Sequence, residues 1–590
     1  MKTIADQKPE AKNLGFKYSF KMLIISLTVL LFSALLANLA FPEFNISILA
    51  FFTITPVFAL TRNERYFKSA FLGYFWSYWY CVMLIFWLRE IHIASPFILA
   101  LLLACFYLPV FLINPFLRRR ILYPAKVLIA GHEAVCQHQV AWYRKTFYCL
   151  TLAAIWTICE WLRSWVLTGL PWNYLATTQW QNISFIQIAE YTGIWGISFI
   201  IAFFNFTFVE DFTKIKNLLQ FKIKQKFLLQ FLPISLFVAL FLIVLNFTTG
   251  FFITKKYQKA YEKSSDKTIV KFGVVQGDLS QRRHAGINES FEALDKYVKL
   301  TKKLRLRYPD ISVVVWPESA VPMPYNIGGH LGISYRAELF NLISKTKIPF
   351  LIGSMYFDEI KGKNNYKMVN SLLHFGANTQ ILNRYDKIHI VPFGEFVPAR
   401  EYMPKFLLKI IDMGRDLKAG TDYSPLKLQD NVFIGVSICF EDVFAEIACK
   451  EAQLGANVLL TVSNDAWYPK SSEPTQHLAN SVFRCVETRL PMVRNGNNSS
   501  SVAISPTGEI IDSVFLDENG NMNVEKRSEA VKQFNVNVEK KPRHSFYTRY
   551  GNIFIWFCWA IVIIALMIAV ENMYCVAKHC DNLMKKLKNC

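Results

Sequence analysis

The sequence predicts a membrane protein in two parts, an α-helical bundle of about eight transmembrane helices and an α/β domain that lies outside the membrane. Composition is the first observation, because 53% of the 590 residues are hydrophobic and only 18% are charged. The second is a set of eight separate apolar runs. The third is a long polar stretch in which strand-like and helix-like patterns alternate. With 50 Phe and 14 Trp, the chain is too hydrophobic for a disordered protein.

The apolar runs are identified by length. A bilayer core of about 30 Å needs roughly 20 mostly apolar helical residues to cross it. The runs that meet this requirement lie near 20–41, 46–61, 69–88, 95–117, 147–168, 193–210, 227–252 and 552–570. The second run is the weakest, since it is short and contains Pro56. The first is longer than the apolar core of a typical signal peptide and is followed by more spans, so we interpret it as an uncleaved helix.

The connections between these runs predict an orientation. One alternate set of connections, together with both termini, carries 22 Lys and Arg residues. The opposite set, apart from the long polar segment, carries Arg89 alone, with Arg163 near the end of a span. This asymmetry is the positive-inside pattern, so we expect both termini in the cytoplasm and the segment from about 253 to 551 on the far side of the membrane.

The topology also accounts for most of the net charge of +21. In a soluble protein such a charge would first suggest nucleic-acid binding. Here most of the excess of Lys and Arg over Asp and Glu falls in the connections assigned to the cytoplasm, so no nucleic-acid partner is expected. Of the 12 cysteines, only Cys439, Cys449 and Cys485 lie in the long polar stretch. Three separated thiols do not predict a disulfide framework.

Residues 268–540 are typical of an α/β domain. Strands are predicted from short β-branched runs, at 269–275, 311–316, 350–355, 432–438 and 458–462. Helical patterns at 290–306 and 475–489 lie between or after them. Strands separated by helix-length segments predict a layered sheet covered by helices.

Three residues near the predicted strand ends could share one chemistry. Glu318 and Cys439 each follow a hydrophobic strand, and Lys387 lies between them in the chain. Sites in open α/β sheets gather at the carboxyl ends of strands. A thiolate could attack a carbonyl there, while a carboxylate takes and returns the proton and an ammonium faces the developing oxyanion. Taken singly, each residue is more often structural: a buried thiol or a paired surface charge.

Five separated motifs, which include these three residues, together resemble those of a known family. They are Val275-Gln276-Gly277-Asp278, Trp316-Pro317-Glu318-Ser319-Ala320, Lys387 with Val391-Pro392-Phe393-Gly394-Glu395, Cys439-Phe440-Glu441-Asp442, and Ser463-Asn464-Asp465-Ala466-Trp467. In this order they resemble the nitrilase superfamily, and most closely the bacterial apolipoprotein N-acyltransferases, in which such a domain is inserted between the seventh and eighth transmembrane helices. The resemblance implies a nitrilase-like αββα sandwich.

The resemblance also implies roles for individual residues. Glu318 would be the general base, Lys387 the oxyanion stabiliser and Cys439 the nucleophile. Glu395 and Glu441 match two supporting acids, which would orient the lysine or tune the thiolate; for Glu395, a buried salt-bridge partner is an equal alternative. Asn464 and Asp465 are expected to fix a turn, and His477 and Arg484 to pack a helix at least as readily as to take part in catalysis.

Two single residues are among the departures from the family pattern. Ala285 stands where a Trp is usual, and Phe440 replaces a usual Tyr. Neither departure removes Glu318, Lys387 or Cys439. Both bear on acyl-donor preference and rate.

The function implied by the resemblance is transfer of an acyl chain from a phospholipid to the N-terminal amine of diacylglyceryl-cysteine lipoproteins, through a thioester on Cys439. We therefore expect a transmembrane bundle at 1–252, a catalytic domain at 253–551 facing the periplasm, and an eighth helix with a basic cytoplasmic tail at 552–590. The protein would lie in the bacterial inner membrane, with no cofactor and no metal. Two alternatives are a membrane-anchored amidase of nitrilase type and an inactive membrane scaffold.

Overall fold

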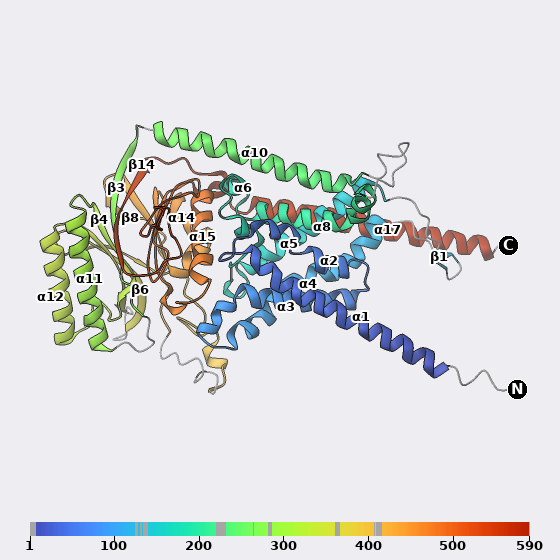
Figure 1. The fold of residues 1–590 in the computed structure, drawn as a ribbon, viewed down its shortest axis with the longest axis horizontal. Helices are drawn as coiled ribbons and strands as arrows, with labels where there is room; N and C mark the ends of the chain where they lie inside the picture. Colours follow the sequence, from blue (N-terminus) through green and yellow to red (C-terminus); the bar gives the residue numbers. More distant parts are fainter. Residues whose placement is uncertain are drawn as a thin grey trace. The chain divides into compact units, whose positions relative to one another are not determined.

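The computed structural model describes residues 8–123, 128–129, 132–133, 140–219, 232–263, 265–280, 286–359, 366–405, 408 and 416–588. The chain divides into two compact units. The first comprises Met1–Thr178, Trp195–Asn246 and Phe554–Cys590, and the second comprises Gln179–Ile194 and Phe247–Ile553. Helices dominate the first unit, while the second contains all the strands of two six-stranded sheets (Figure 1).

The long helices lie where the sequence predicts apolar runs. They are α1 (Lys8–Ala37), α3 (Tyr66–Leu84), α4 (Ser95–Leu117), α5 (Trp142–Arg163), α8 (Trp195–Leu219), α10 (Ile234–Lys263) and α17 (Ile553–Lys588). The run at 46–61 forms instead two short helices, η2 (Ser47–Phe52) and α2 (Thr55–Thr61). Pro56 lies in the first turn of α2, where a proline is tolerated because its missing N–H has no helical partner.

Among the described residues, five helical segments are long and apolar enough to cross a membrane: Phe20–Ala40, Ser95–Leu122, Trp195–Phe212, Ile234–Tyr261 and Ile553–Cys575. The predicted count of eight is therefore not confirmed. Helices α3 and α5 form where spans are predicted but are not among the five. Only 17% of the apolar window in Phe20–Ala40, and the same share in Ile234–Tyr261, is buried inside the protein. Apolar helical surface of this extent needs a lipid environment, so the chain is a membrane protein.

The second unit is a four-layer α/β sandwich. One sheet has the order β14-β3-β4-β5-β6-β7 and the other has the order β13-β12-β11-β10-β9-β8. The strands of the first sheet are β3 (Lys267–Gln276), β4 (Val313–Val321), β5 (Phe350–Glu359), β6 (Tyr366–Phe375), β7 (Ile381–Asp386) and β14 (Ala530–Glu539). Those of the second are β8 (Leu426–Gln429), β9 (Val432–Ile438), β10 (Val458–Asn464), β11 (Met492–Asn497), β12 (Val502–Ile504) and β13 (Ile510–Ser513).

Helices cover the outer face of each sheet. Helices α11 (Ile287–Arg307) and α12 (Gly329–Thr346) lie beside one another next to the first sheet, and α14 (Ala445–Gln453) and α15 (Glu473–Thr488) pack on the second (Figure 1). The central strands are parallel, and β14, β6, β7, β8, β12 and β13 pair antiparallel to their neighbours. The predicted nitrilase-like αββα sandwich is confirmed in this unit.

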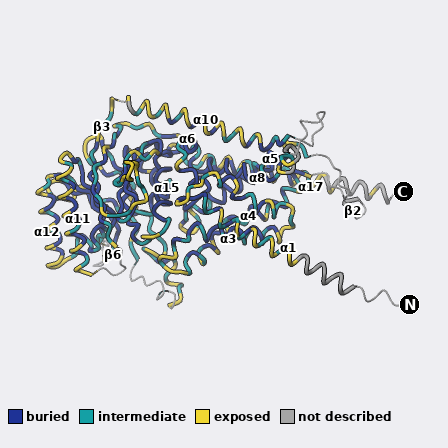
Figure 2. Tube along the Cα trace, in the orientation of Figure 1, coloured by how far each residue is buried: buried dark blue, intermediate teal, exposed yellow. Residues whose placement is uncertain are grey.

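Strand β4 shows why its sequence is a continuous hydrophobic run. Val313 and Val315 belong to the core between the two sheets, whereas Val314 and Trp316 face the layer formed by α11 and α12. Successive side chains of a strand point to opposite faces, so a strand covered on both sides must be apolar at every position. The buried trace through the sheets in Figure 2 reflects this arrangement. The polar residues that follow such strands are therefore held at the edge of a fully packed core.

Candidate active site

Glu318, Lys387 and Cys439 come from three different strands. Glu318 lies within β4, Lys387 directly follows β7, and Cys439 directly follows β9 as the first residue of the short helix η9 (Cys439–Val443). Cys439 has φ +54°, in the left-handed region that costs a non-glycine residue energy. This strained turn places the thiol between a strand end and a helix start. Glu318 and Lys387 are buried, with 7% and 1% of their surface exposed, and Cys439 is half-buried.

The three side chains converge. Lys387 Nζ lies 3.6 Å from Glu318 Oε1, and the Cys439 thiol is within hydrogen-bonding reach of the Glu318 carboxylate. The ammonium of Lys387 also acts electrostatically on the Cys439 sulfur. The structure therefore brings together the nucleophile, base and cation that the sequence motifs predict for this site.

Burial controls the protonation of these groups. Burial raises the pKa of the Cys439 thiol well above its usual value, and the Glu318 carboxylate adds to this while Lys387 opposes it. Burial also raises the pKa of Glu318, and the Lys387 charge opposes that shift. The resting thiol thus keeps its proton. A protonated thiol beside an accepting carboxylate is the arrangement that general-base activation of a nucleophile requires.

Three residues, Glu395, Asn370 and Asn464, hold Lys387 and Glu318. Glu395 Oε1 lies 2.8 Å from Lys387 Nζ, closer than Glu318 does. Despite burial, the two carboxylates raise the pKa of Lys387, so the lysine is a cation. Asn370 Nδ2 donates to Glu318 Oε1 at 2.7 Å and to Glu395 Oε1 at 3.3 Å, and the backbone N–H of Asn464 donates to Glu318 Oε2 at 3.0 Å. Glu318 therefore accepts hydrogen bonds on both oxygens, as an ionised carboxylate does.

Glu441 acts on the backbone around the site. Its carboxylate accepts hydrogen bonds from the backbone N–H groups of Ile388 at 2.6 Å, His389 at 3.0 Å and Ile438 at 2.7 Å. The Tyr385 hydroxyl adds a further bond at 3.1 Å. Burial raises the pKa of Glu441 to about 7, although these backbone donors oppose the shift. One side chain thus ties the segment that follows Lys387 to the residue that precedes Cys439.

Asn370 is the main site residue that the sequence motifs do not reveal. It lies on β6, outside all five motifs, and its only sequence signal is a polar residue within a hydrophobic strand. Asn464, which the sequence places in a turn, does cap η10 (Asp465–Trp467): its side chain accepts from the backbone N–H of Ala466. Its own N–H holds the carboxylate of Glu318, which no turn motif alone could indicate.

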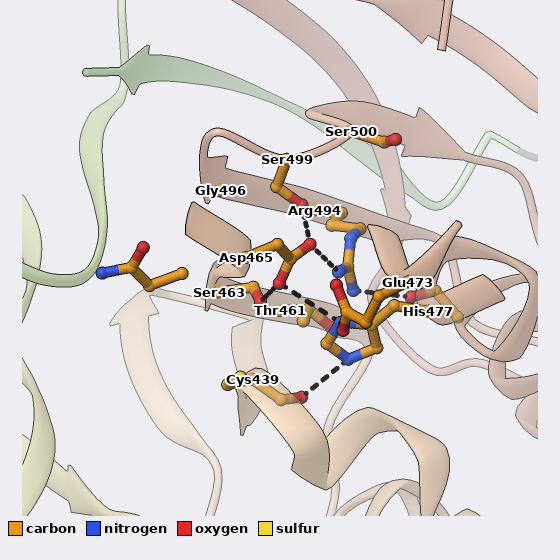
Figure 3. A network of polar contacts seen from close by, with 12 residues as sticks. Cys439, Thr461, Ser463, Asp465, Glu473, His477, Arg494, Gly496, Ser499 and Ser500 are labelled. Carbon is orange, nitrogen blue, oxygen red and sulfur yellow. Dashed lines mark hydrogen bonds and ion pairs between the residues drawn. The ribbon is translucent and has the colours of Figure 1, made fainter. Parts of the chain in front are cut away.

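A second cluster of charged residues lies next to Cys439 (Figure 3). His477 Nε2 is 3.1 Å from the backbone carbonyl oxygen of Cys439, and His477 Nδ1 is 3.3 Å from Asp465 Oδ1. Arg494 contacts both Asp465 and Asp442. His477 thus belongs to the surroundings of Cys439, while Arg484 binds the backbone carbonyl of Val443 at 2.7 Å.

The two departures from the family pattern have different outcomes. Ala285 lies outside the described residues. Phe440 is half-buried and packs edge-on against Phe444, with ring centroids 5.3 Å apart, and against the His389 ring at 6.1 Å. The ring at position 440 therefore has a packing role that needs no hydroxyl.

Comparison with known proteins identifies the family. Residues 33–207 match the model of the apolipoprotein N-acyltransferase N-terminal domain, and residues 273–525 match the carbon-nitrogen hydrolase model. Both matches occur in one chain, on the helical part and on the sandwich respectively. The chain belongs to the apolipoprotein N-acyltransferase family.

Individual relatives support the same family assignment. An apolipoprotein N-acyltransferase of Geobacter metallireducens is 29% identical over 70% of this chain and 72% of its own length. One from Rickettsia bellii is 27% identical over 82% of this chain and 88% of its own. Among solved structures, a carbon-nitrogen hydrolase from Helicobacter pylori is 15% identical to this chain, with a TM-score of 0.32. The alignment covers 45% of this chain and 89% of the hydrolase chain.

Proposed function

We propose that this protein transfers an acyl chain from a phospholipid to the N-terminal amine of diacylglyceryl-cysteine lipoproteins, with Cys439 as nucleophile, Glu318 as general base and Lys387 as oxyanion stabiliser. The observation that carries the proposal is the convergence of the three groups: Lys387 Nζ at 3.6 Å from Glu318 and the Cys439 thiol within reach of the same carboxylate. The family and the apolar helices supply the setting, a membrane enzyme with access to lipid esters.

The first half-reaction forms a thioester. Cys439 Sγ attacks the ester carbonyl carbon of the phospholipid while its proton passes to Glu318. The negative charge that develops on the carbonyl oxygen faces the Lys387 ammonium. When the ester C–O bond breaks, the leaving oxygen takes the proton from Glu318 and departs as lysophospholipid. The acyl chain is left on Cys439.

The second half-reaction forms the amide. The α-amine of the lipoprotein attacks the thioester carbonyl carbon and gives a proton to Glu318. The C–S bond then breaks, and the sulfur takes that proton back. Dividing one transfer into two steps in this way is typical of covalent catalysis, and it requires that water be kept from the thioester.

Glu395 and Glu441 are proposed as positioning residues. The 2.8 Å contact of Glu395 supports a role in holding the lysine cation, and the three backbone hydrogen bonds of Glu441 support a role in fixing the two loops. A buried cation that lost its nearest partner would be costly, so Glu395 serves the charge state of Lys387.

We also propose the topology that the basic residues predict. Residues 1–252 would form the transmembrane bundle, 253–551 the catalytic domain on the periplasmic side of the bacterial inner membrane, and 552–590 an eighth helix with a cytoplasmic tail. Reporter fusions placed after residues 219 and 588 should be active in the cytoplasm, whereas fusions within 253–551 should be active in the periplasm. The reverse result would overturn the orientation.

The chemical proposal is tested by trapping the acyl-enzyme. Purified protein is incubated with phospholipid carrying a labelled acyl chain, and the Cys439 peptide is examined by mass spectrometry. We expect the mass of one acyl chain on Cys439, released by a diacylglyceryl-cysteine peptide and not formed in Cys439→Ala. Cys449→Ala, which removes a buried thiol elsewhere in the same unit, is the matched control and should form the thioester normally. Transfer by Cys439→Ala would contradict the mechanism, and release of ammonia from small amides without transfer to an amine would favour an amidase.

A further inference from the structure

Four buried charged residues form an ion cluster beside Cys439. They are Asp442, Asp465, His477 and Arg494, and each exposes no more than 1% of its surface. Arg494 Nη1 lies 2.5 Å from Asp442 Oδ2, and Arg494 Nη2 lies 3.2 Å from Asp465 Oδ2. His477 Nε2 lies 2.7 Å from Asp442 Oδ1. Two cations and two anions thus balance one another in a region from which water is excluded.

The hydrogen bonds of His477 define its charge. Nδ1 faces a carboxylate oxygen of Asp465, and Nε2 faces the backbone carbonyl oxygen of Cys439 (Figure 3). A carbonyl oxygen can only accept, and Asp465 already accepts from the Ser463 and Ser499 hydroxyls and from Arg494. Both ring nitrogens must therefore donate, which only the imidazolium form can do. The two aspartates outweigh burial and the Arg494 charge and raise the pKa of His477 to about 10.

The cluster joins two turns that carry the proposed chemistry. One is the left-handed turn at Cys439, whose carbonyl His477 holds. The other is the turn at Asn464, whose backbone N–H binds Glu318 and whose next residue is Asp465. His477 contacts both turns from α15. Asp465 also acts on the thiol: its negative charge contributes to raising the pKa of Cys439.

We propose that His477 is a positioning residue of the acyl transfer: its imidazolium ties the Cys439 turn to the Asn464 turn and neutralises Asp442 and Asp465, whose charges would otherwise oppose formation of the thiolate. The proposal rests on the proposed function, because it assumes that Cys439 is the nucleophile. The groups that face His477 are Asp442 from η9, Asp465 from η10, Glu473 from α15 itself, Arg494 from β11 and the Cys439 backbone.

A metal-binding site is the alternative interpretation of this cluster. One ligand atom each from Asp465, Glu473 and His477 lie within 4.8 Å of one another. A metal would need a deprotonated ring nitrogen, whereas both nitrogens of His477 donate. Burial raises the pKa of Glu473 well above its usual value, and the Asp465 charge adds to this, which disfavours the ionised form that would bind a metal. These features favour the ion cluster.

The test measures the thiol directly, without lipid. Full-length protein in detergent is alkylated with iodoacetamide from pH 6 to pH 11, and modification of the Cys439 peptide is quantified by mass spectrometry. In His477→Gln we expect alkylation near pH 8 to slow about tenfold, equal to a pKa rise of about one unit, because a cation is lost and the aspartates remain. Asp465→Asn removes an anion and should shift the profile in the opposite direction.

The double variant separates charge from packing. His477→Gln with Asp465→Asn removes one charge of each sign, so its profile should return toward that of the wild type. If the cluster were merely structural, both single variants would change in the same direction and the double variant would be worse than either. That pattern would overturn the proposal, even if His477→Gln alone failed to fold, because Asp465→Asn must still accelerate alkylation.

Two controls complete the design. His374→Gln removes another buried histidine of the same unit, on β6, and should leave the Cys439 profile unchanged. A chelator should also leave the wild-type profile unchanged, whereas a shift would assign the place to a metal and overturn the proposal. Since alkylation requires no acyl donor, a wild type that formed no thioester would contradict the proposed function and leave this readout intact.

Discussion

Asn370 lies closer to Glu318 than Lys387 does. The distance from Asn370 Nδ2 to Glu318 Oε1 is 2.7 Å, against 3.6 Å from Lys387 Nζ to the same atom. The amide also reaches Glu395 at 3.3 Å, so one neutral side chain bridges two carboxylates that would otherwise repel each other. A hydrogen bond donated to a carboxylate favours its charged form. Asn370 therefore favours the ionised form of Glu318, which the proposed role as general base requires.

Replacement of Asn370 by Ala should slow acylation of Cys439 by about 10- to 100-fold, less than the roughly 10²- to 10⁴-fold that a general base typically contributes, because Glu318 itself is kept. Because the pKa of Glu318 loses one of the interactions that lower it, the acidic limb of the pH–rate profile should move to higher pH. Single-turnover acylation from pH 5 to pH 9 measures both effects. Asn378→Ala, in an exposed turn, is the control. A loss of rate without a shifted limb would assign Asn370 a packing role instead.

Glu395→Gln should impair the reaction through Lys387. The variant removes the nearest carboxylate of a buried ammonium, so the pKa of Lys387 should fall and the oxyanion should be stabilised less well. We expect a loss of about 100-fold in kcat, comparable with removal of one oxyanion donor, with little change in KM. Asp310→Asn, which breaks the exposed pair with Lys271, should change the rate less than about twofold. Equal effects of the two variants would contradict the assignment.

Much of the fold could be predicted because the sandwich has regular patterns. The five predicted strands all form, and 432–438 matches β9 at both ends. Helices were also predicted correctly where α11 and α15 lie. The antiparallel strands from β6 to β8 and from β12 to β14 were not predicted. Four of them, β7, β8, β13 and β14, are the edge strands of the two sheets, and their exposed or half-buried residues weaken the hydrophobic pattern. In the other unit the 46–61 run was misleading, because composition alone does not show that a helix is interrupted.

Glu318 and Cys439 were predictable as site candidates because they lie within or directly after hydrophobic strands, whereas Lys387 follows β7, which was not predicted, and was found only through its motif. Glu318, Lys387 and Cys439 meet because their strands present polar residues at the edge of one packed core. Asn370 and the N–H of Asn464 were not predictable. Their contacts depend on how β6 and β10 lie relative to β4, and no local spacing encodes this. The links from His477 to Asp442 and Asp465 likewise join three separate segments of the chain.

Glu441→Gln should disrupt the backbone around the site without changing its size. The Glu441 carboxylate accepts hydrogen bonds from backbone N–H groups on both oxygens. A glutamine amide would place its NH₂ group against at least one of these N–H groups, so two donors would face each other. We expect thioester formation to fall by about 100-fold, as is common when a supporting hydrogen bond at an active site is lost. Glu446→Gln, at an exposed position on α14, should retain the wild-type rate. Normal acylation by Glu441→Gln would show that the three backbone bonds are dispensable.

Phe440→Tyr tests whether the missing hydroxyl matters. The ring contacts with Phe444 and His389 can be kept by a tyrosine, so we expect acylation within about threefold of the wild type. Phe440→Ala, which removes both ring contacts, should instead lower the rate more than tenfold and lower the melting temperature. Rates with a series of acyl-chain lengths would show whether the hydroxyl alters donor preference. A large gain from Phe440→Tyr would mean that the natural phenylalanine limits the chemistry.

Two buried histidines, His477 and His374, should make stability change with pH in opposite directions. The pKa of His477 is raised to about 10 in the folded protein, above the value near 6.5 expected in an unfolded chain. The stabilisation of the folded state by the protonated His477 is therefore complete below pH 6.5 and is lost as the pH rises toward 10. Burial lowers the pKa of His374, so the folded state keeps its full stability from the neutral His374 above pH 6.5 and loses stability as the pH falls. We therefore expect His477→Gln to flatten the fall in melting temperature between pH 7 and pH 10, and His374→Gln to flatten the fall below pH 6.5. Fluorescence-detected melting of the full-length protein at half-unit pH steps measures both slopes, and the same slope change in both variants would contradict the charged state assigned to His477.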